Sequence, residues 1–281
     1  MQRERDDGVR RSGPDVSVIV TTYRRELQVL EAIRSVLAQR GAATEIIVVD
    51  DSPEGTARDG VEALASPDVR YVHRAVPSGG HPGLVRNDAV ALAHAPLIHF
   101  LDDDDRLADG ALVALAEAMR TKKTGMAFGK IVPFGDEPAV SEQTRYFRRV
   151  AEAARRIRGR RRWFAANLMF LDSLLVNSAC MVRRDVFEAA GGYDASLRCC
   201  EDVELYLRIG RAHGVTFVDR DVLHYRVGGP SIMKEVRDRP GHPSMLHTYR
   251  TMGERYRGLY GVTEYRMLQL LAKTARQLAL A

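Results

Sequence analysis

The chain has 281 residues, of which 45% are hydrophobic and 28% are charged, a composition that excludes a largely disordered protein and is typical of globular domains. Its 42 basic and 37 acidic residues nearly balance, so the formal net charge of +5 bears on function only where basic residues are concentrated. The sequence has no run of about 18 apolar residues, which excludes an ordinary transmembrane helix.

The first 15 residues and the cysteines indicate the cellular compartment of the protein. Residues 1–15 are polar, contain Gly and Pro, and lack the apolar segment of a signal peptide, so we expect a flexible tail. The three cysteines form no CxxC pair and no metal-ligand spacing, and their odd number suits a reducing compartment: Cys180, Cys199 and Cys200. We therefore expect a soluble cytoplasmic protein, with peripheral membrane contact left open.

Short apolar runs predict the strands of the first half of the chain. These runs are continuous rather than alternating, and helix-compatible segments lie between them. This pattern predicts an α/β fold, with a mostly parallel sheet covered on both faces by helices. The runs occupy residues 16–23, 45–51, 69–74, 97–101 and 125–134.

Apolar residues at helical spacing predict the helices between these strands. A Gly/Pro-rich loop opens one helix over about residues 84–94. Another helix should bury Leu112, Leu115 and Met119. The helix after the first strand ends at Gly41. One of its faces should be buried, made of Leu27, Leu30, Ile33 and Leu37.

Polar motifs follow three of the predicted strands where each strand ends. They are Thr-Thr-Tyr at 21–23, Asp-Asp-Ser at 50–52 and four aspartates at 102–105. Ligands of open parallel sheets bind outside the carboxyl ends of the strands. We therefore expect the three motifs to meet in one crevice.

The four consecutive aspartates predict a metal site. Clustered carboxylates repel one another unless a cation neutralises them. Alternate positions, such as Asp102 and Asp104, can face one side of an extended segment, and hard oxygen ligands of this kind suit Mg²⁺ or Mn²⁺. We expect Asp105 and Asp109 instead to cap the following helix and face solvent.

The pattern changes after about Ser141. Nine arginines lie in a helical segment between Arg145 and Arg162. A strand, a short helix and a Gly-Gly turn follow, and then a helix with Glu201 and Asp202 in its first turn. Residues 215–227 predict one or two further strands, and the tail from Ser244 is mostly helical.

The order of these motifs resembles the family 2 glycosyltransferases, which are inverting enzymes of the GT-A fold that use nucleotide-diphosphate sugars. The resemblance rests on VSVIVTTYRR, EIIVVDDS, GLVRN, HFLDDDDRL, GGYD and CEDVELYLR, and it covers Val16 to Ser231. It implies a Rossmann-like mostly parallel sheet. It also implies a nucleotide-sugar-binding half (16–132), an acceptor-binding half with the catalytic base (133–243) and a helical C-terminal extension (244–281).

The resemblance implies roles for residues on the donor side. Thr21 and Tyr23 match residues that border the nucleotide base, and Asp51 matches an aspartate that hydrogen-bonds the base; the alternative for Asp51 is an ordinary turn before Pro53. Two further residues match an arginine-asparagine pair near the nucleotide, although Val85 replaces the usual alanine: Arg86 and Asn87.

The same resemblance implies a metal motif and a catalytic base. Asp102 and Asp103 would belong to the nucleotide-sugar site, with Asp102 facing the ribose or the metal, and Asp104 would bind the metal. His224 matches a region that approaches the metal in some relatives, a structural histidine being the alternative. The catalytic base would be Asp202, which follows Glu201 in the ED motif. The alternative is that Asp202 is an ordinary carboxylate in the first turn of a helix.

These roles predict metal-assisted transfer of a single sugar to a hydroxyl acceptor, whether a glycan, a lipid-linked molecule or a natural product. UDP is the first expectation for the donor nucleotide, with dTDP and GDP open. Processive polymer synthesis is not expected, because GRRRWF precedes the ED motif and no transmembrane helix is present.

The alternatives to a glycosyltransferase are a sugar nucleotidyltransferase and a nucleotide-sugar-binding module without catalysis. A sugar nucleotidyltransferase would need a Gly-rich loop after the first strand, and a catalytically silent nucleotide-sugar-binding module would not need the base. The arginines between 145 and 162 could contact an anionic membrane, an acidic acceptor or only solvent. No nucleic-acid partner is expected, since no aromatic stacking platform accompanies them. A homodimer is left open.

Overall fold

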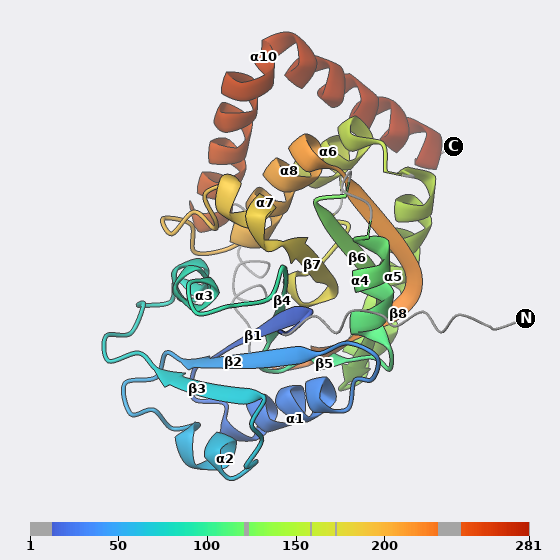
Figure 1. Cartoon of the computed structure of the whole chain (residues 1–281). Coiled ribbons are helices and arrows are strands. Elements are labelled where there is room, and N and C mark those ends of the chain that lie inside the picture. Colours follow the sequence, from blue (N-terminus) through green and yellow to red (C-terminus); the bar gives the residue numbers. More distant parts are fainter. Residues whose placement is uncertain (1–12, 121–123, 158, 172, 230–242, 281) are drawn as a thin grey trace, which may run out of the picture.

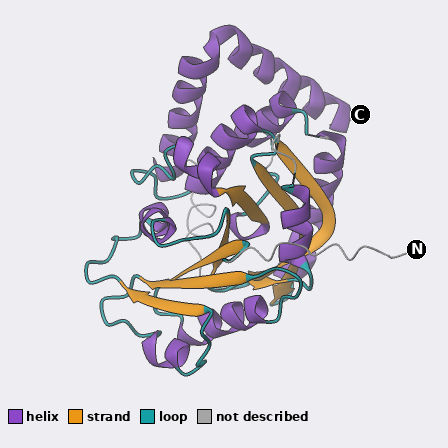
Figure 2. Cartoon of the chain, in the orientation of Figure 1, coloured by secondary structure: helices purple, strands orange, loops and turns teal. Residues whose placement is uncertain are grey.

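A computed structural model describes residues 13–120, 124–157, 159–171, 173–229 and 243–280. Within them, eight strands form one curled sheet in the order β3-β2-β1-β4-β7-β6-β8-β5, with helices packed around it (Figures 1 and 2). The predicted tail is mostly outside the described residues. No described helix combines the length and the apolar character needed to cross a bilayer.

The first four strands are parallel, as the continuous apolar runs predict. The register places Thr22 beside Asp50 and Thr21 beside Asp102, so the three polar motifs do end at one edge of the sheet. The strands are β1 (Val16–Thr22), β2 (Thr44–Asp50), β3 (Val69–His73) and β4 (Leu97–Asp102).

The remaining strands extend the same sheet. β7 is antiparallel to both neighbours and β5 is antiparallel to β8, so four of the seven strand pairs are parallel. The strands are β5 (Arg106–Leu107), β6 (Met126–Gly135), β7 (Cys180–Arg183) and β8 (Val215–Val227). Because β6 crosses residue 132, one sheet runs through both halves of the chain.

Helices cover both faces of the sheet. Val18 and Val20 of β1 join a core with α1 and α4, whereas Ile19 joins the opposite core with α3, α6 and α8. The helices are α1 (Glu26–Leu37), α2 (Arg58–Glu62), α3 (Pro82–Val90), α4 (Ala111–Ala118), α5 (Ala139–Ile157), α6 (Arg161–Phe170), α7 (Arg184–Ala189), α8 (Glu201–His213) and α10 (Pro243–Leu280), with a 3₁₀ turn η1 (Asn177–Ala179).

The face that α1 buries is rotated from the predicted one: Ile33 is buried and Leu30 and Leu37 are partly buried against the core, but Leu27 is not. Leu27 is 76% exposed, and the buried positions are Val29, Ala32, Ile33 and Val36. Both sets have helical spacing, so periodicity alone does not choose between them. The prediction for Leu112, Leu115 and Met119 is confirmed, because all three are buried.

Candidate active site

The four aspartates after β4 alternate between accessible and buried side chains. The side chains of Asp102 and Asp104 are 33% and 27% exposed, whereas that of Asp103 is 7% exposed. Asp105 is 1% exposed as a residue. An extended backbone turns successive side chains to opposite sides, so the predicted pair does face one side.

Asp103 is held within the protein. One carboxylate oxygen accepts a hydrogen bond from Thr22 Oγ1 at 2.7 Å, and the other accepts one from Arg25 Nη1 at 2.8 Å. Burial raises the pKa of Asp103 to about 6, and Arg25 opposes that rise. Both oxygens therefore serve to fix the loop. Arg25, to which sequence reasoning gave no role, also lies 2.7 Å from Asp104 Oδ2.

The prediction that Asp105 caps a helix and faces solvent is wrong. Its Oδ1 accepts a hydrogen bond from the backbone N–H of Arg226 in β8 at 2.9 Å, and its Oδ2 is buried without a partner among the described residues. Burial and the neighbouring carboxylates raise its pKa well above the ordinary value. The cause is β5, which pairs with β8 directly after the aspartates and encloses Asp105. Asp109 is exposed, as expected.

The aspartates at the end of β2 have separate tasks. Asp50 forms the local turn, because its carboxylate accepts bonds from the backbone and hydroxyl of Ser52 at 2.9 and 2.6 Å. Asp51 does not join that turn. It reaches across to the Gly/Pro-rich loop before α3, where it accepts bonds from the backbone and hydroxyl of Ser78 at 2.9 and 2.6 Å.

Thr21 and Tyr23 border the same strand edge. Thr21 is partly buried between β2 and β4, where it pairs in register with Val49 and Asp102. Tyr23 is 49% exposed, with the guanidinium of Arg24 5.4 Å from its ring centroid. Tyr23 thus presents an accessible aromatic face beside the aspartates.

Arg86 of α3 connects the aspartates of β4 to the first turn of α8. Its Nη2 lies 2.7 Å from Asp102 Oδ1, and its Nη1 lies 2.6 Å from Glu201 Oε1. The side chains of Arg86 and Glu201 are each 8% exposed, so this ion pair is buried. The two ends of the predicted site therefore share one guanidinium.

Asn87 supports the Gly-Gly-Tyr-Asp turn rather than facing the site. Its side chain accepts a bond from the backbone N–H of Tyr193 and donates one to the carbonyl of Tyr193, both at 2.9 Å. A Cβ atom on Gly192 would lie 2.6 Å from Asn87 Oδ1, which explains a glycine in this turn. Asn87 therefore fixes the turn over Arg86, whose guanidinium carbon lies 5.5 Å from the Tyr193 ring centroid.

Asp202 and Glu201 open α8, as predicted. Cys200, with φ of 55°, precedes them in the left-handed region. Asp202 is partly buried, and its Oδ1 accepts a bond from the Val203 N–H at 2.8 Å. Burial and the charge of Glu201 raise the pKa of Asp202 to about 7, while Arg86 opposes the rise. A carboxylate with a pKa near neutrality suits a general base.

His224 lies one strand away from the aspartates. It is partly buried in β8, where it pairs in register with Arg106 of β5 and Val132 of β6. Within the described part of the chain it makes no hydrogen bond or ion pair, so neither the metal role nor the structural role predicted for it is supported by a contact.

Asn177 of the turn η1 is a site residue that sequence reasoning missed. Its Oδ1 accepts hydrogen bonds from the hydroxyls of Tyr193 and Tyr206, both at 2.8 Å, and its Nδ2 lies 3.3 Å from Asp102 Oδ1. Asn177 is buried, so these bonds are shielded from water. No motif marks it, because its partners come from three distant segments.

The accessible aspartates fit a divalent metal that keeps other ligands. Among the described residues, no group of three or more His, Cys, Asp or Glu side chains surrounds a common point. Mg²⁺ and Mn²⁺ sites of nucleotide enzymes use only one or two carboxylates and fill the rest with phosphate oxygens and water. Asp102 Oδ2 and Asp104 Oδ1 make no hydrogen bond in the described structure and could serve as these ligands.

Comparison with known proteins identifies the family. The model of glycosyl transferase family 2 matches residues 17–191, more than half of the chain. The chain belongs to this family. "Uncharacterized protein MT1568" of Mycobacterium tuberculosis is 31% identical over 217 residues, which cover 74% of this chain and 66% of that protein. "GalNAc(5)-diNAcBac-PP-undecaprenol beta-1,3-glucosyltransferase" of Campylobacter jejuni is 34% identical over 107 residues, covering 37% and 34%.

The family 2 chain thus spans about two thirds or less of the length of these relatives. Solved structures support the fold. S. aureus TarS 1-349 in complex with UDP-GlcNAc has a TM-score of 0.65 at 16% identity, covering 89% of this chain and 69% of that chain. Mannosyltransferase PcManGT from Pyrobaculum calidifontis, in complex with GDP-Man and Mn²⁺, has a TM-score of 0.57 at 18% identity, covering 95% and 81%. The predicted GT-A fold is confirmed.

Proposed function

We propose that this family 2 protein transfers a single sugar from a nucleotide-diphosphate sugar to an acceptor hydroxyl, with inversion at the sugar carbon. The observation that carries the proposal is Arg86, which bonds Asp102 and Glu201 at 2.7 and 2.6 Å. This contact brings the aspartate motif of β4 next to the first turn of α8. In this proposal, the leaving-group site and the base would therefore lie close together.

Asp202 is the base in this proposal. Glu201 is buried and committed to Arg86, whereas Asp202 Oδ2 makes no hydrogen bond among the described residues. Near pH 7 a large share of Asp202 is ionised and can accept the acceptor's hydroxyl proton while the sugar carbon is attacked. Glu201 acts on the reaction only by its charge and by holding Arg86.

Asp102 and Asp104 would hold a divalent metal. When bound, Mn²⁺ or Mg²⁺ would stabilise the negative charge that develops on the departing diphosphate. The Pyrobaculum neighbour was solved in complex with GDP-Man and Mn²⁺, which supports this assignment. Arg86 keeps Asp102 oriented from behind, at 2.7 Å, and leaves its second oxygen available.

The donor nucleotide would lie along the ends of β1 and β2. Tyr23 offers an exposed ring for the base, Thr21 borders it, and Asp51 holds the loop at Ser78 that would flank it. The two structural neighbours are complexes with UDP-GlcNAc and with GDP-Man, which supports UDP or GDP, with dTDP open. Residues 16–132 would thus bind the donor and 133–243 the acceptor.

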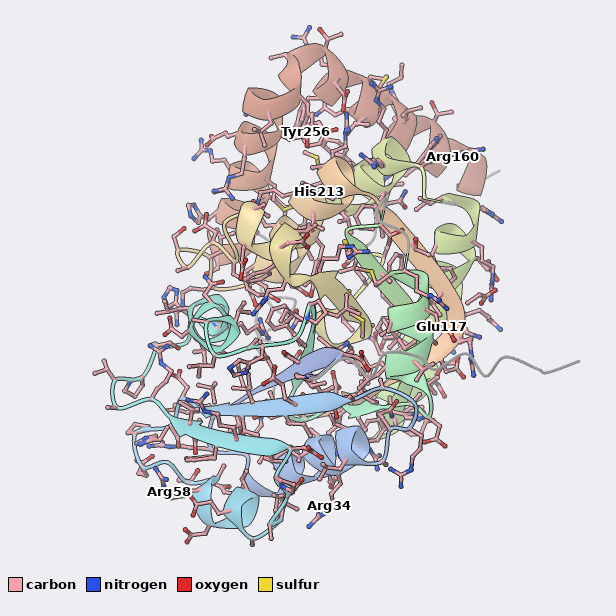
Figure 3. The ribbon with its side chains drawn as sticks, in the orientation of Figure 1. Arg34, Arg58, Glu117, Arg160, His213 and Tyr256 are labelled. Carbon is pink, nitrogen blue, oxygen red and sulfur yellow. The ribbon has the colours of Figure 1, made fainter. Side chains whose placement is uncertain are left out.

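The acceptor is proposed to be a glycan or a lipid-linked sugar. The name of the Campylobacter relative includes an undecaprenol-linked glycan, which supports this class. A lipid-linked acceptor is held in a membrane, and the exposed arginines along α5 would bring the protein to that membrane. Arg160, at the junction of α5 and α6, extends this row of arginines (Figure 3). Peripheral contact with an anionic membrane is therefore part of the proposal.

A donor screen tests the function. Purified protein is incubated with UDP-, GDP- and dTDP-sugars, and release of the nucleotide is measured with Mn²⁺ and again after chelation. We expect one donor class to react and chelation to abolish release. Asp202→Asn should bind the nucleotide as the wild type does and lose roughly 100-fold or more of the transfer rate, whereas exposed Asp109→Asn should change neither. Full turnover by Asp202→Asn would remove the proposed base.

A further inference from the structure

Arg25, the last residue of the VSVIVTTYRR motif, forms an ion pair in the donor site, and the proposed function gives it no task. It follows β1 by three residues, at the strand edge where the aspartates lie. One nitrogen, Nη1, lies 2.8 Å from Asp103 Oδ1 and 2.7 Å from Asp104 Oδ2. The Arg25 side chain is 32% exposed, so it reaches the accessible side of the site.

The two aspartates bound by Arg25 differ in how firmly they are held. Asp103 is 7% exposed and also bonds Thr22 at 2.7 Å, so it stays in place without Arg25. Asp104 is 27% exposed, and among the described residues Arg25 is the only side chain that its carboxylate contacts. Arg25 is therefore the counter-ion of Asp104 when no ligand is bound.

We propose that Arg25 is a cation of the donor site that changes its partner on ligand binding. Its guanidinium would leave Asp104 and contact the diphosphate of the donor. This inference rests on the proposed function. A divalent cation and a guanidinium compete for the same carboxylate, because both neutralise the same charge at close range. A guanidinium released from Asp104 is suited to a diphosphate, whose oxygens match its planar donors.

The exchange assigns Arg25 two opposite effects on binding. It should weaken the binding of metal alone, because the metal must displace it from Asp104. It should strengthen the binding of a nucleoside diphosphate, because it supplies a positive charge at the phosphates. A residue that merely held the loop would affect both ligands in the same direction.

The test compares Arg25→Gln with Arg24→Gln. Arg24 is the adjacent residue and pairs with Glu54 at 2.6 Å on the surface, so its variant removes the same charge away from the aspartates. Mn²⁺ binding without nucleotide is measured from the spin-resonance signal of free Mn²⁺. Binding of UDP and of GDP without metal is measured by calorimetry.

In Arg25→Gln we expect Mn²⁺ to bind about tenfold tighter, and the nucleotide that binds the wild type to bind about tenfold weaker. Arg24→Gln should match the wild type in Mn²⁺ affinity. If Arg25→Gln also matches the wild type, or if it weakens both ligands together, the exchange is overturned. A wild type that binds no nucleotide even when Mn²⁺ is present would overturn the proposed function instead.

Arg25→Lys keeps the test decisive if Arg25→Gln does not fold. A lysine retains the charge near Asp104 but lacks the planar donors. We expect Mn²⁺ affinity close to that of the wild type and reduced nucleotide affinity. Nucleotide affinity equal to that of the wild type in Arg25→Lys would show that the guanidinium does not reach the diphosphate.

Discussion

Arg86 Nη1 lies 2.6 Å from Glu201 Oε1, which joins two buried side chains 115 residues apart in the sequence. Breaking a buried ion pair leaves the partner charge uncompensated, which costs about 3–5 kcal/mol. Arg86→Met should therefore lower the free energy of unfolding by that amount, measured by urea denaturation at pH 7. It should also abolish transfer, because Asp102 loses the same guanidinium.

Two variants control for this experiment. Arg58→Gln breaks a surface pair with Glu62 at 3.3 Å, and we expect it to change stability by less than about 0.5 kcal/mol. The double variant Arg86→Met with Glu201→Gln should recover part of the stability lost in Arg86→Met, because one of the unpaired carboxylates is gone. A single Arg86→Met variant as stable as Arg58→Gln would contradict the buried-pair argument.

The pKa of Asp202 gives the proposed reaction a pH dependence with a definite sign. The pKa is raised to about 7, and a base must be ionised to accept a proton. With metal and donor at fixed concentrations, kcat/KM should rise about tenfold per pH unit below pH 7 and level off above it. A rate that is constant between pH 5.5 and 7.5 would exclude Asp202 as the base.

Glu201→Gln tests the cause of that pKa. The negative charge of Glu201 raises the pKa of Asp202, and Arg86 lowers it. Removing the charge of Glu201 should move the acid limb of the pH profile to lower pH, whatever its effect on the maximal rate. A profile that keeps its midpoint in Glu201→Gln would show that burial alone sets the pKa.

The same raised pKa makes stability depend on pH. The folded state binds a proton at Asp202 more tightly than the unfolded state, in which the carboxyl has its ordinary pKa of about 4. The protonated form therefore contributes stability below about pH 4, and this contribution is lost as the pH rises through 7. Asp202→Asn should be more stable than the wild type at pH 8, and urea curves should show the gap closing by pH 4. A gap independent of pH would contradict this argument.

Much of this site follows from the sequence, because it depends on local backbone geometry. Strand ends place Thr22, Asp50 and Asp102 together through the parallel register. An extended backbone turns Asp102 and Asp104 to one side and Asp103 to the other, which spacing predicts. Spacing does not say which side is buried, and Asp103, expected to bind the nucleotide sugar, is the buried one.

The residues that sequence reasoning missed depend on contacts between distant segments. Asp105 is buried because β8, more than a hundred residues later, pairs beside it. Asn177 draws partners from β4, α8 and the turn before α8. Arg25 ends the VSVIVTTYRR motif, and its position just after β1 was the one indication that it could reach the aspartates.

Gly83 sets how closely α3 approaches Tyr193 and the first turn of α8. A Cβ atom there would lie 2.9 Å from Tyr193 Cβ and 3.3 Å from Glu201 Cγ. Gly83→Ala should therefore destabilise the protein by about 1–3 kcal/mol, because packed neighbours must shift. Gly258→Ala is the matched control, since nothing lies within 4 Å of its Cβ and alanine favours the helix by up to about 1 kcal/mol. Equal melting temperatures for the two variants would contradict the packing argument.

The arginines of α5 give a test of membrane contact. Arg148 and Arg149 are exposed and make no ion pair within the described residues, whereas Arg155 of the same helix bonds Asp219 at 2.8 Å. Each cation near an anionic surface contributes about 1 kcal/mol. Replacing Arg148 and Arg149 by Gln should therefore weaken binding to vesicles with roughly 30% phosphatidylglycerol by about thirtyfold.

The matched control removes two charges from the opposite end of the molecule. Arg34 and Arg58 lie there, far from Arg160 (Figure 3), and their replacement by Gln should leave vesicle binding nearly unchanged. Co-sedimentation at low and high salt measures both variants, and salt should weaken only the binding that depends on charge. If the two double variants bind alike, α5 does not face the membrane. If the wild type does not bind anionic vesicles, the arginines form a solvated helix face. The proposal of an acceptor presented on a membrane would then have no support from α5.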